Sequence, residues 1–203
     1  MMSTIGEYDY LLMSLQWPPT VCKGGCPGKT FPNKFLIHGL WPTNTSKPYP
    51  EFFSKDPAHA YHKMSSSLEA QLQKDWPNLL TGTDEDFWTN EWSKHGTCSL
   101  DKFSQEEYFE LALKIRKNID ILALLNNAGI VPRNNLRGYG RASIVNAIKV
   151  GTQNFEPGIM CAPGTSTLQE VRLCLVADGS TYRDCPLAIR VVNCKTSIIS
   201  LPI

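Results

Sequence analysis

The sequence predicts an α+β fold, with strands towards both ends of the chain and helices between them. Near the N-terminus, and again over the last third of the chain, apolar residues run together or alternate with polar ones, which is typical of strands. In the middle, apolar residues recur every three or four positions, which is typical of helices. Strands grouped at the ends, rather than alternating with helices, indicate the α+β class.

Two strands are expected in the N-terminal part. The segment 8–17 is rich in aromatic and aliphatic residues and stops at two consecutive prolines, so it predicts a mostly buried strand. The short apolar run 35–37 predicts a second strand, which delivers His38 at its end before a turn at Gly39. The proline-containing segment 43–57 predicts a long loop.

The central block contains the predicted helices. The first has an apolar stripe and stops before a proline, and the second begins with the capping residue Thr83 and an acidic first turn. The third begins with a capping box that starts at Ser104. The predicted helices cover 64–76, 83–95, 104–119, 121–127 and 143–150.

The pattern returns to alternation in the C-terminal third. Over 168–177 the apolar residues occupy one face, while Glu170 and Arg172 occupy the other. An Asp-Gly pair follows at 178–179 and predicts a hairpin. The segments 181–184 and 187–192 are the next predicted strands.

Composition narrows the class of protein. The length of 203 residues predicts one domain, 1–203, and the 42% hydrophobic and 19% charged content excludes a mostly disordered chain. The net charge of +1 argues against a protein that coats nucleic acid, but allows an enzyme that binds a few nucleotides. No apolar run approaches transmembrane length, so no membrane partner is expected. With no recognisable signal peptide, we expect a mature form to which a start methionine was added.

The cysteines favour an oxidising compartment. The chain has seven, and none is spaced with other cysteines or histidines as in a zinc finger. A disulfide framework is therefore the better interpretation. The triplet that begins at Asn44 is an N-glycosylation motif in the predicted loop, which agrees with a secreted protein.

Two short stretches contain candidate catalytic residues. His38 follows the second apolar run, and Glu91, Lys94 and His95 are spaced so that a helix would present them on one face. That helix also has two tryptophans one turn apart, at 88 and 92, so it should be largely buried, and burying charged groups needs a reason. Two histidines with a carboxylate and an ammonium are suited to acid–base chemistry on a phosphodiester.

Two alternatives stay open from the residues alone. A histidine at a strand end, or a charged helix face, is often purely structural. His38, Glu91 and His95 could also ligate a metal, although Lys94 disfavours a divalent cation and the HExxH motif is absent. The remaining histidines, His59 and His62, are interpreted as surface residues.

The segments 35–42 (FLIHGLWP) and 87–98 (FWTNEWSKHGTC) resemble the two active-site segments of the ribonuclease T2 family. The resemblance extends to 8–22, to the DWPNLL segment at 75–80 and to the cysteine-rich C-terminal third, and it is strongest to plant S-like and pistil self-incompatibility ribonucleases. It implies a central antiparallel sheet with surrounding helices. It also implies RNA cleavage to a 2′,3′-cyclic phosphate without metal or cofactor.

Residue roles follow from the same resemblance. His95 would be the base that takes the 2′-hydroxyl proton, and His38 the acid that protonates the leaving 5′-oxygen. Glu91 and Lys94 would support the negatively charged transition state. Asn90 stands where many members have a histidine that binds phosphate, so substrate binding should be weaker. The implied base-binding residues are Gln16, Trp41, Asn78, Leu79, Leu80 and Phe87, with core packing as the alternative for Trp41, Leu79 and Leu80.

The resemblance also implies the disulfides Cys22–Cys26, Cys161–Cys194 and Cys174–Cys185, which leaves Cys98 as a free thiol. The expected protein is a secreted or vacuolar monomer that acts on single-stranded RNA. Its role would be self-incompatibility, with a pollen-side recognition protein as partner, or defence and phosphate scavenging. The alternative is a catalytically weak binding or storage protein on the same scaffold.

Overall fold

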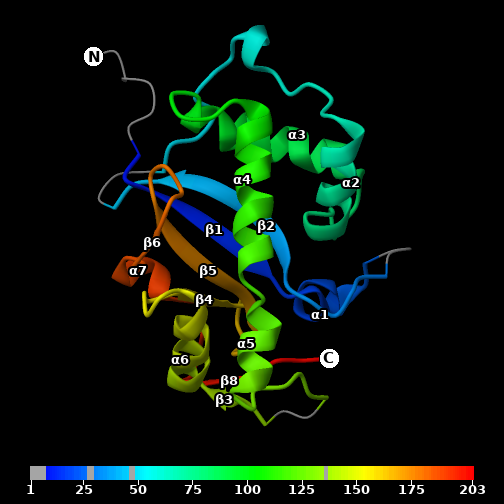
Figure 1. The fold of residues 1–203 in the computed structure, drawn as a ribbon. Helices are drawn as coiled ribbons and strands as arrows, with labels where there is room; N and C mark the ends of the chain where they lie inside the picture. The colour runs from blue at the N-terminus through cyan, green and yellow to red at the C-terminus, as the bar shows by residue number, and fades with distance from the viewer. Residues whose placement is uncertain (1–7, 27–29, 46–48, 135–136) are drawn as a thin grey trace.

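A six-stranded sheet forms the centre of the molecule (Figure 1), in a computed structural model that describes residues 8–26, 30–45, 49–134 and 137–203. The strand order is β2-β1-β5-β4-β7, β6 also pairs with β5, and all pairs are antiparallel except β4–β7. The strands are β1 (Tyr10–Gln16), β2 (Leu36–Thr43), β4 (Gly158–Cys161), β5 (Leu168–Val176), β6 (Tyr182–Arg183) and β7 (Val191–Val192). A second sheet contains β3 (Tyr139–Gly140) and β8 (Ile198–Ile199).

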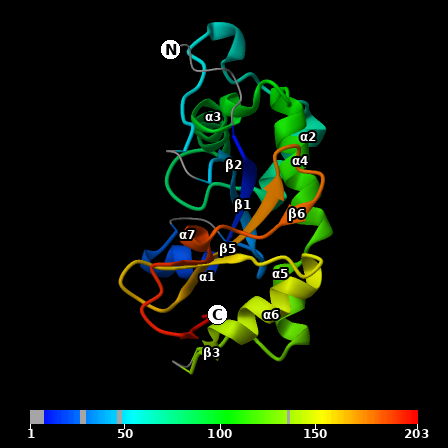
Figure 2. The same cartoon turned by 90° about the vertical axis from the view of Figure 1, so that its left-hand side faces the viewer.

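Helices cover both faces of this sheet. The long helix α4 crosses one face, and the 90° view places the short α7 on the opposite side (Figure 2). The helices are α1 (Pro18–Val21), α2 (Ser66–Asp75), α3 (Asp84–Lys94), α4 (Gln105–Asn118), α5 (Ile121–Asn127), α6 (Arg141–Gly151) and α7 (Leu187–Arg190). The α+β class with a central antiparallel sheet is therefore confirmed.

Alternation along β1 explains why both faces need a cover. All seven residues of this strand are buried. Leu11 and Met13 belong to the main core together with Tyr108 of α4, whereas Leu12 belongs to a smaller cluster on the other face with Ile189 of α7. Burial of apolar side chains on both faces stabilises the sheet as a rigid platform.

The predicted helices are confirmed with small changes at their ends. The predicted capping box at Ser104 opens α4, and the predicted cap Thr83 opens α3, where it forms a second capping box with Asp86. Trp88 and Trp92 of α3 are each only 2% exposed, as their spacing predicted. The proline pair after β1 begins the short helix α1, because proline fits the first turn of a helix.

The prediction that the second strand ends at residue 37 is wrong. Strand β2 continues through His38 and Gly39 to Thr43. Its register shifts at this point: Ser14 of β1 pairs with Gly39 and Leu15 pairs with Ile37, so His38 is an extra residue without a partner on β1. The sequence pattern at His38 and Gly39, which predicted the end of a strand, therefore marks a β-bulge within a longer strand.

The predicted strand 187–192 is also wrong over most of its length. Residues 187–190 form α7, in which the N–H groups of Ile189 and Arg190 both donate to the carbonyl of Pro186. In a strand, Leu187 and Ile189 would share a face, but the helical turn buries Ile189 and leaves Leu187 81% exposed. Only the last two residues form a strand, β7, beside β4.

The structure contains three disulfides and one free thiol among the seven cysteines. Cys98 is the free cysteine, and it is buried directly after α3. One disulfide joins β5 to the segment before α7, and another joins β4 to the segment after β7. The pairs are Cys22–Cys26, Cys161–Cys194 and Cys174–Cys185, the same three that the resemblance implied.

Candidate active site

The bulge in β2 directs the side chains of His38 and Trp41 towards the same cavity. Residues three apart on a regular strand point to opposite faces of the sheet. The extra residue in β2 cancels this alternation, so His38 and Trp41 both line a cavity of about 470 Å³. Their rings are 5.1 Å apart at the centroids and meet edge to face. A bulge that redirects side chains in this way is common beside active sites.

The opposite wall of the cavity comes from α3 and its C-terminal end. The helix stops at Lys94, and His95 is the residue that follows it as the C-cap. Glu91, Lys94 and His95 nevertheless all line the cavity with His38, as their spacing predicted. Phe87 and Asn90, one turn earlier on the helix, also line it.

Buried tryptophans fix the position of α3. The indole N–H of Trp88 donates to the carbonyl of Trp76 at 2.7 Å, and that of Trp92 donates to the carbonyl of His59 at 2.8 Å. Trp76 itself donates to the carbonyl of His38 at 3.0 Å. These bonds connect the helix wall to the strand wall, so the two histidines are held on one rigid frame.

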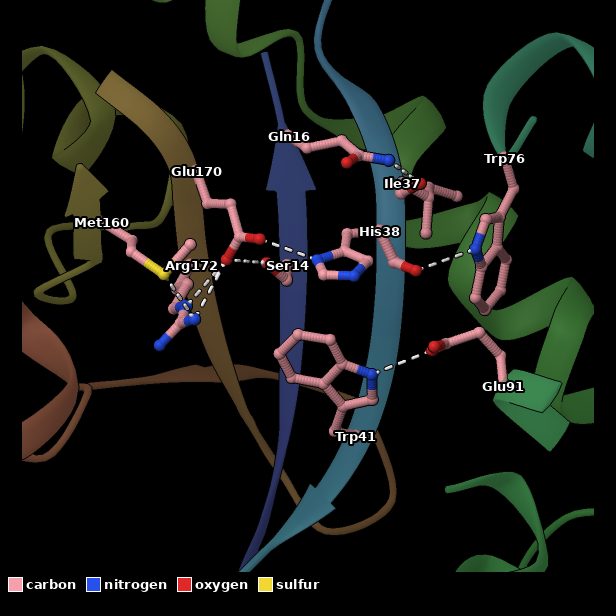
Figure 3. A network of polar contacts seen from close by, with 10 residues as sticks. All are labelled: Ser14, Gln16, Ile37, His38, Trp41, Trp76, Glu91, Met160, Glu170 and Arg172. Carbon is pink, nitrogen blue, oxygen red and sulfur yellow. Dashed lines mark hydrogen bonds and ion pairs between the residues drawn. The ribbon is translucent and has the colours of Figure 1, made fainter. Parts of the chain in front are cut away.

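One hydrogen bond crosses the cavity between its two walls. The Trp41 indole donates to the buried carboxylate of Glu91 at 2.9 Å (Figure 3). A Cβ on Gly39 would overlap both groups, which explains the glycine at this position. Burial raises the pKa of Glu91, although the charge of His38, the indole bond and the charge of Lys94 oppose this.

The sequence did not identify the residue that binds His38. Its Nδ1 lies 2.7 Å from Oε1 of Glu170 on β5, and the other carboxylate oxygen accepts hydrogen bonds from Ser14 and Arg172 (Figure 3). Glu170 is 1% exposed, so this carboxylate belongs to the interior of the sheet. The available signal was the polar face of the strand 168–177, where two charged residues interrupt an otherwise buried sheet.

The two histidines have opposite proton affinities. Burial lowers the pKa of His38, but the hydrogen bond and charge of Glu170, with the further charge of Glu91, outweigh burial and raise it overall. For His95, burial together with the charges of Lys94 and His38 lowers the pKa to about 4. Near neutral pH the cavity therefore contains a histidine that favours its proton and a histidine that lacks one.

A loop borders the cavity next to Lys94. The Lys94 ammonium lies 3.3 Å from a carboxylate oxygen of Glu51, and the Phe52 N–H donates to the Lys94 carbonyl at 2.8 Å. Phe52 has a positive φ of 51°, which is uncommon for a bulky residue and shows that the loop is held in a specific conformation. Tyr49 of the same loop also lines the cavity.

The other residues implied for base binding lie outside this cavity. Gln16 is buried and donates to the Ile37 carbonyl at 3.3 Å. The Asn78 amide donates to carbonyls of its own loop and its oxygen accepts from the Leu80 N–H. Leu79 is buried, which agrees with the core alternative, whereas Leu80 is 58% exposed at the surface.

The remaining predictions concern metal and surface sites. Within the described residues, no three or more His, Cys, Asp or Glu side chains are grouped to hold a metal ion, so the trio of the metal hypothesis forms no such group. His59 and His62 are exposed, as predicted. Asn44 follows β2, but residue 46 of its glycosylation motif lies outside the described residues. None of the helices in the described ranges is long and apolar enough to cross a membrane.

Comparisons with known proteins place these features in a family. The model of the ribonuclease T2 family matches residues 8–185. Ribonuclease MC of Momordica charantia is 37% identical over 193 residues, covering 88% of this chain and 94% of that protein. Ribonuclease S-7 of Nicotiana alata is 32% identical over 186 residues, covering 89% and 83%. The solved structure of RNase NT in complex with 5′-AMP has a TM-score of 0.80 at 31% identity, covering 97% of this chain and all of that one. The chain belongs to the ribonuclease T2 family.

Proposed function

We propose that this protein is a plant endoribonuclease that cleaves single-stranded RNA by transesterification, without a metal or another cofactor. One observation supports this most directly: two histidines with opposite proton affinities line the same cavity. Before the reaction a general base must be unprotonated and a general acid must be protonated. The environment of His95 suits the base, and the environment of His38 suits the acid.

The reaction needs only proton transfers and one displacement at phosphorus. Neutral His95 takes the proton of the 2′-hydroxyl, and the resulting oxygen forms a bond to the adjacent phosphorus. The bond from phosphorus to the 5′-oxygen of the next nucleotide breaks, and His38 donates its proton to that oxygen. The products are a 2′,3′-cyclic phosphate and a new 5′-hydroxyl, so DNA, which lacks the nucleophile, is no substrate.

Charge stabilisation comes from the helix wall. During the reaction negative charge accumulates on the non-bridging oxygens of the phosphate, and a nearby ammonium lowers the energy of that state. Lys94 supplies this ammonium, and Glu91 orients the site through its bond to Trp41. Asn90 donates a neutral hydrogen bond to the phosphate, in the role that many relatives give to a histidine.

Base binding would use the aromatic and exposed apolar residues around the cavity. Unpaired bases stack on such side chains with little dependence on sequence. Trp41 and Phe87 line the cavity and Leu80 is exposed near the start of α3, so these three are suited to stacking. Gln16, Asn78 and the buried Leu79 would shape a neighbouring site, in which Gln16 and Asn78 are fixed by their hydrogen bonds to the backbone.

The disulfides and the Asn44 motif support a secreted or vacuolar, glycosylated protein, which we expect to act as a monomer. Its role is self-incompatibility, through a pollen-side recognition protein, or defence and phosphate scavenging. Transcript abundance in pistils, compared with phosphate-starved leaves, separates the two roles.

The decisive assay is cleavage of a single-stranded RNA oligonucleotide in the presence of a chelator. We expect cleavage, with a 2′,3′-cyclic phosphate visible by mass spectrometry on the 5′ fragment. The matched control contains one 2′-deoxynucleotide at the preferred position and should be resistant there. Equal cleavage of the control, or loss of activity that zinc restores, would contradict the mechanism.

A further inference from the structure

We propose that Glu170 is a positioning residue for the acid: it fixes the imidazole ring of His38 and balances the positive charge of that ring. This inference rests on the proposed function, in which His38 protonates the leaving oxygen. It adds to that function a carboxylate from another strand, which does not itself line the cavity.

The geometry leaves Glu170 little freedom. Its Oε1 lies 2.7 Å from His38 Nδ1, and its Oε2 accepts from the Ser14 hydroxyl at 2.8 Å and from the Arg172 guanidinium at 3.0–3.1 Å. With 1% exposure, the side chain cannot exchange these partners for water. Three donors from three strands therefore hold one carboxylate in one place (Figure 3).

This arrangement decides which nitrogen of His38 faces the substrate. Since Nδ1 is occupied by Glu170, Nε2 is the nitrogen left for the leaving oxygen. A carboxylate that binds one ring nitrogen fixes both the tautomer and the orientation of an imidazole. Without it, the ring on a bulged strand could rotate and present either nitrogen.

The carboxylates around His38 outweigh the cations and favour its protonated form. Glu170 approaches it from β5 and Glu91 from α3, and both raise its pKa. Arg172, also on β5, opposes them, and the cation Lys94 and His95 lie across the cavity. Although burial opposes ionisation of Glu170, the bond and charge of His38 and the charge of Arg172 lower its pKa to about 2. Glu170 thus acts as a fixed negative charge, and the shared proton stays on the imidazole for transfer to the substrate.

The test replaces Glu170 by glutamine and measures kcat/KM on a dinucleotide from pH 4 to 9. Glutamine keeps the shape and an acceptor oxygen but removes the charge, so His38 loses its proton at lower pH. We expect the alkaline limb to move to lower pH, with a loss of roughly tenfold or more at pH 8 and less than about twofold at pH 5. The decrease should appear in kcat more than in KM.

Ser14→Ala is the matched control, because it removes a buried hydrogen bond from the same carboxylate and leaves its charge. Its pH profile should keep the wild-type limbs. A uniform loss in Glu170→Gln without movement of the alkaline limb would show a purely structural role and overturn the inference. NMR titration of wild-type His38 needs no variant: a pKa at or below the ordinary value of about 6.5 would overturn it too.

A second substrate separates this inference from the proposed function. A nucleoside 3′-phosphodiester with a p-nitrophenyl leaving group needs no proton on departure. Both His38→Ala and Glu170→Gln should be much less impaired on it than on the dinucleotide, whereas His95→Ala should be impaired on both. If His38→Ala is equally impaired on both, the proposed acid is wrong; if only Glu170→Gln behaves so, the positioning role alone is wrong.

Discussion

The two walls of the cavity differ in how they hold a histidine. On the strand wall, His38 occupies a bulge in an interior sheet and binds a buried carboxylate. On the helix wall, His95 follows the last turn of α3 beside Lys94, and no carboxylate bonds to it among the described residues. The same side chain is therefore placed next to a fixed anion on one wall and next to a cation on the other.

This difference teaches how identical groups acquire opposite roles. Free imidazoles have one ordinary pKa, so without the protein neither histidine is preferred as acid or base. The walls separate the two pKa values before any substrate binds, and the proposed mechanism therefore places the acid on β2 and the base at the end of α3. Changes to one wall, to both walls or to the contact between them therefore test this assignment.

The largest effect is expected from removing either imidazole. His38→Ala and His95→Ala should each lower kcat on a dinucleotide by about 10²–10⁴-fold, the range for loss of an acid or base. Circular dichroism should stay close to wild type for both, and so should thermal unfolding for His95→Ala. His38→Ala should unfold at a lower temperature, because it leaves the buried carboxylate of Glu170 without one of its partners. His59→Ala, at an exposed histidine, is the control and should keep full activity. A variant at position 38 or 95 with near wild-type cleavage would remove that residue from the mechanism.

The pH profile of the wild-type enzyme tests both walls together. His95 must be unprotonated, and its pKa of about 4 predicts that kcat/KM falls below that pH, by about tenfold per unit. His38 must be protonated, and its raised pKa predicts that activity persists above the ordinary imidazole value before it declines. A profile that falls on both sides of a narrow maximum near 6.5 would mean that the walls do not separate the two groups.

The next effect concerns how each wall is stabilised. The strand wall has the Cys174–Cys185 disulfide beside β5, whereas Cys98 behind the helix wall is unpaired. Cys174→Ala combined with Cys185→Ala should lower the free energy of unfolding by about 2–5 kcal/mol, as for other native disulfides. Cys98→Ala should cost only about 1 kcal/mol, from lost packing. Urea unfolding measures both, and equal costs would contradict the comparison.

Much of the helix wall could be predicted from the sequence, because its signals are local. The cap at Thr83 and the spacing of Trp88 and Trp92 depend on neighbours within a few residues. The strand wall depends on register between distant segments. In strand β4, apolar and polar residues do not alternate, so the sequence did not indicate a strand there. Residues 187–190 have the pattern of a strand but form a helix, in which Ile189 packs into the smaller core cluster.

The same contrast applies to the site. Glu91, Lys94 and His95 lie one helical turn apart in a single segment, so their spacing alone predicted that they face the same site. Glu170 is 132 positions from His38 in the chain, and only the pairing of β1 with both β2 and β5 brings the two together. A bulge shifts the register by one residue and cannot be placed from hydrophobic pattern alone.

Gly39 tests the contact between the walls. A Cβ there would overlap the Trp41 indole nitrogen and the Glu91 carboxylate. Gly39→Ala should therefore break their hydrogen bond and cost about 1–3 kcal/mol of stability, as other overpacked sites do, with reduced activity. Gly24→Ala is the matched control, because nothing lies within 4 Å of its added Cβ. If the two variants have the same thermal unfolding midpoint and activity, the close approach is unimportant.

The smallest effect is expected from adding a second imidazole to the helix wall. Asn90 is exposed and lines the cavity with Lys94, so its side chain can reach a phosphate bound there. Asn90→His replaces a neutral hydrogen bond by a charge-assisted one whenever the new imidazole is protonated. Solvent screening at an exposed position limits the gain to about 1 kcal/mol, or roughly fivefold in kcat/KM. Since an exposed imidazole has an ordinary pKa, the gain should appear below about pH 6.5 and vanish above it.

Asn90→Gln, which adds length without charge, should show no such pH dependence. The measurement is kcat/KM on a dinucleotide from pH 5 to 8 for all three proteins. A uniform loss in Asn90→His, with the fold intact, would mean that this wall has repacked around asparagine and no longer admits a second cation beside Lys94.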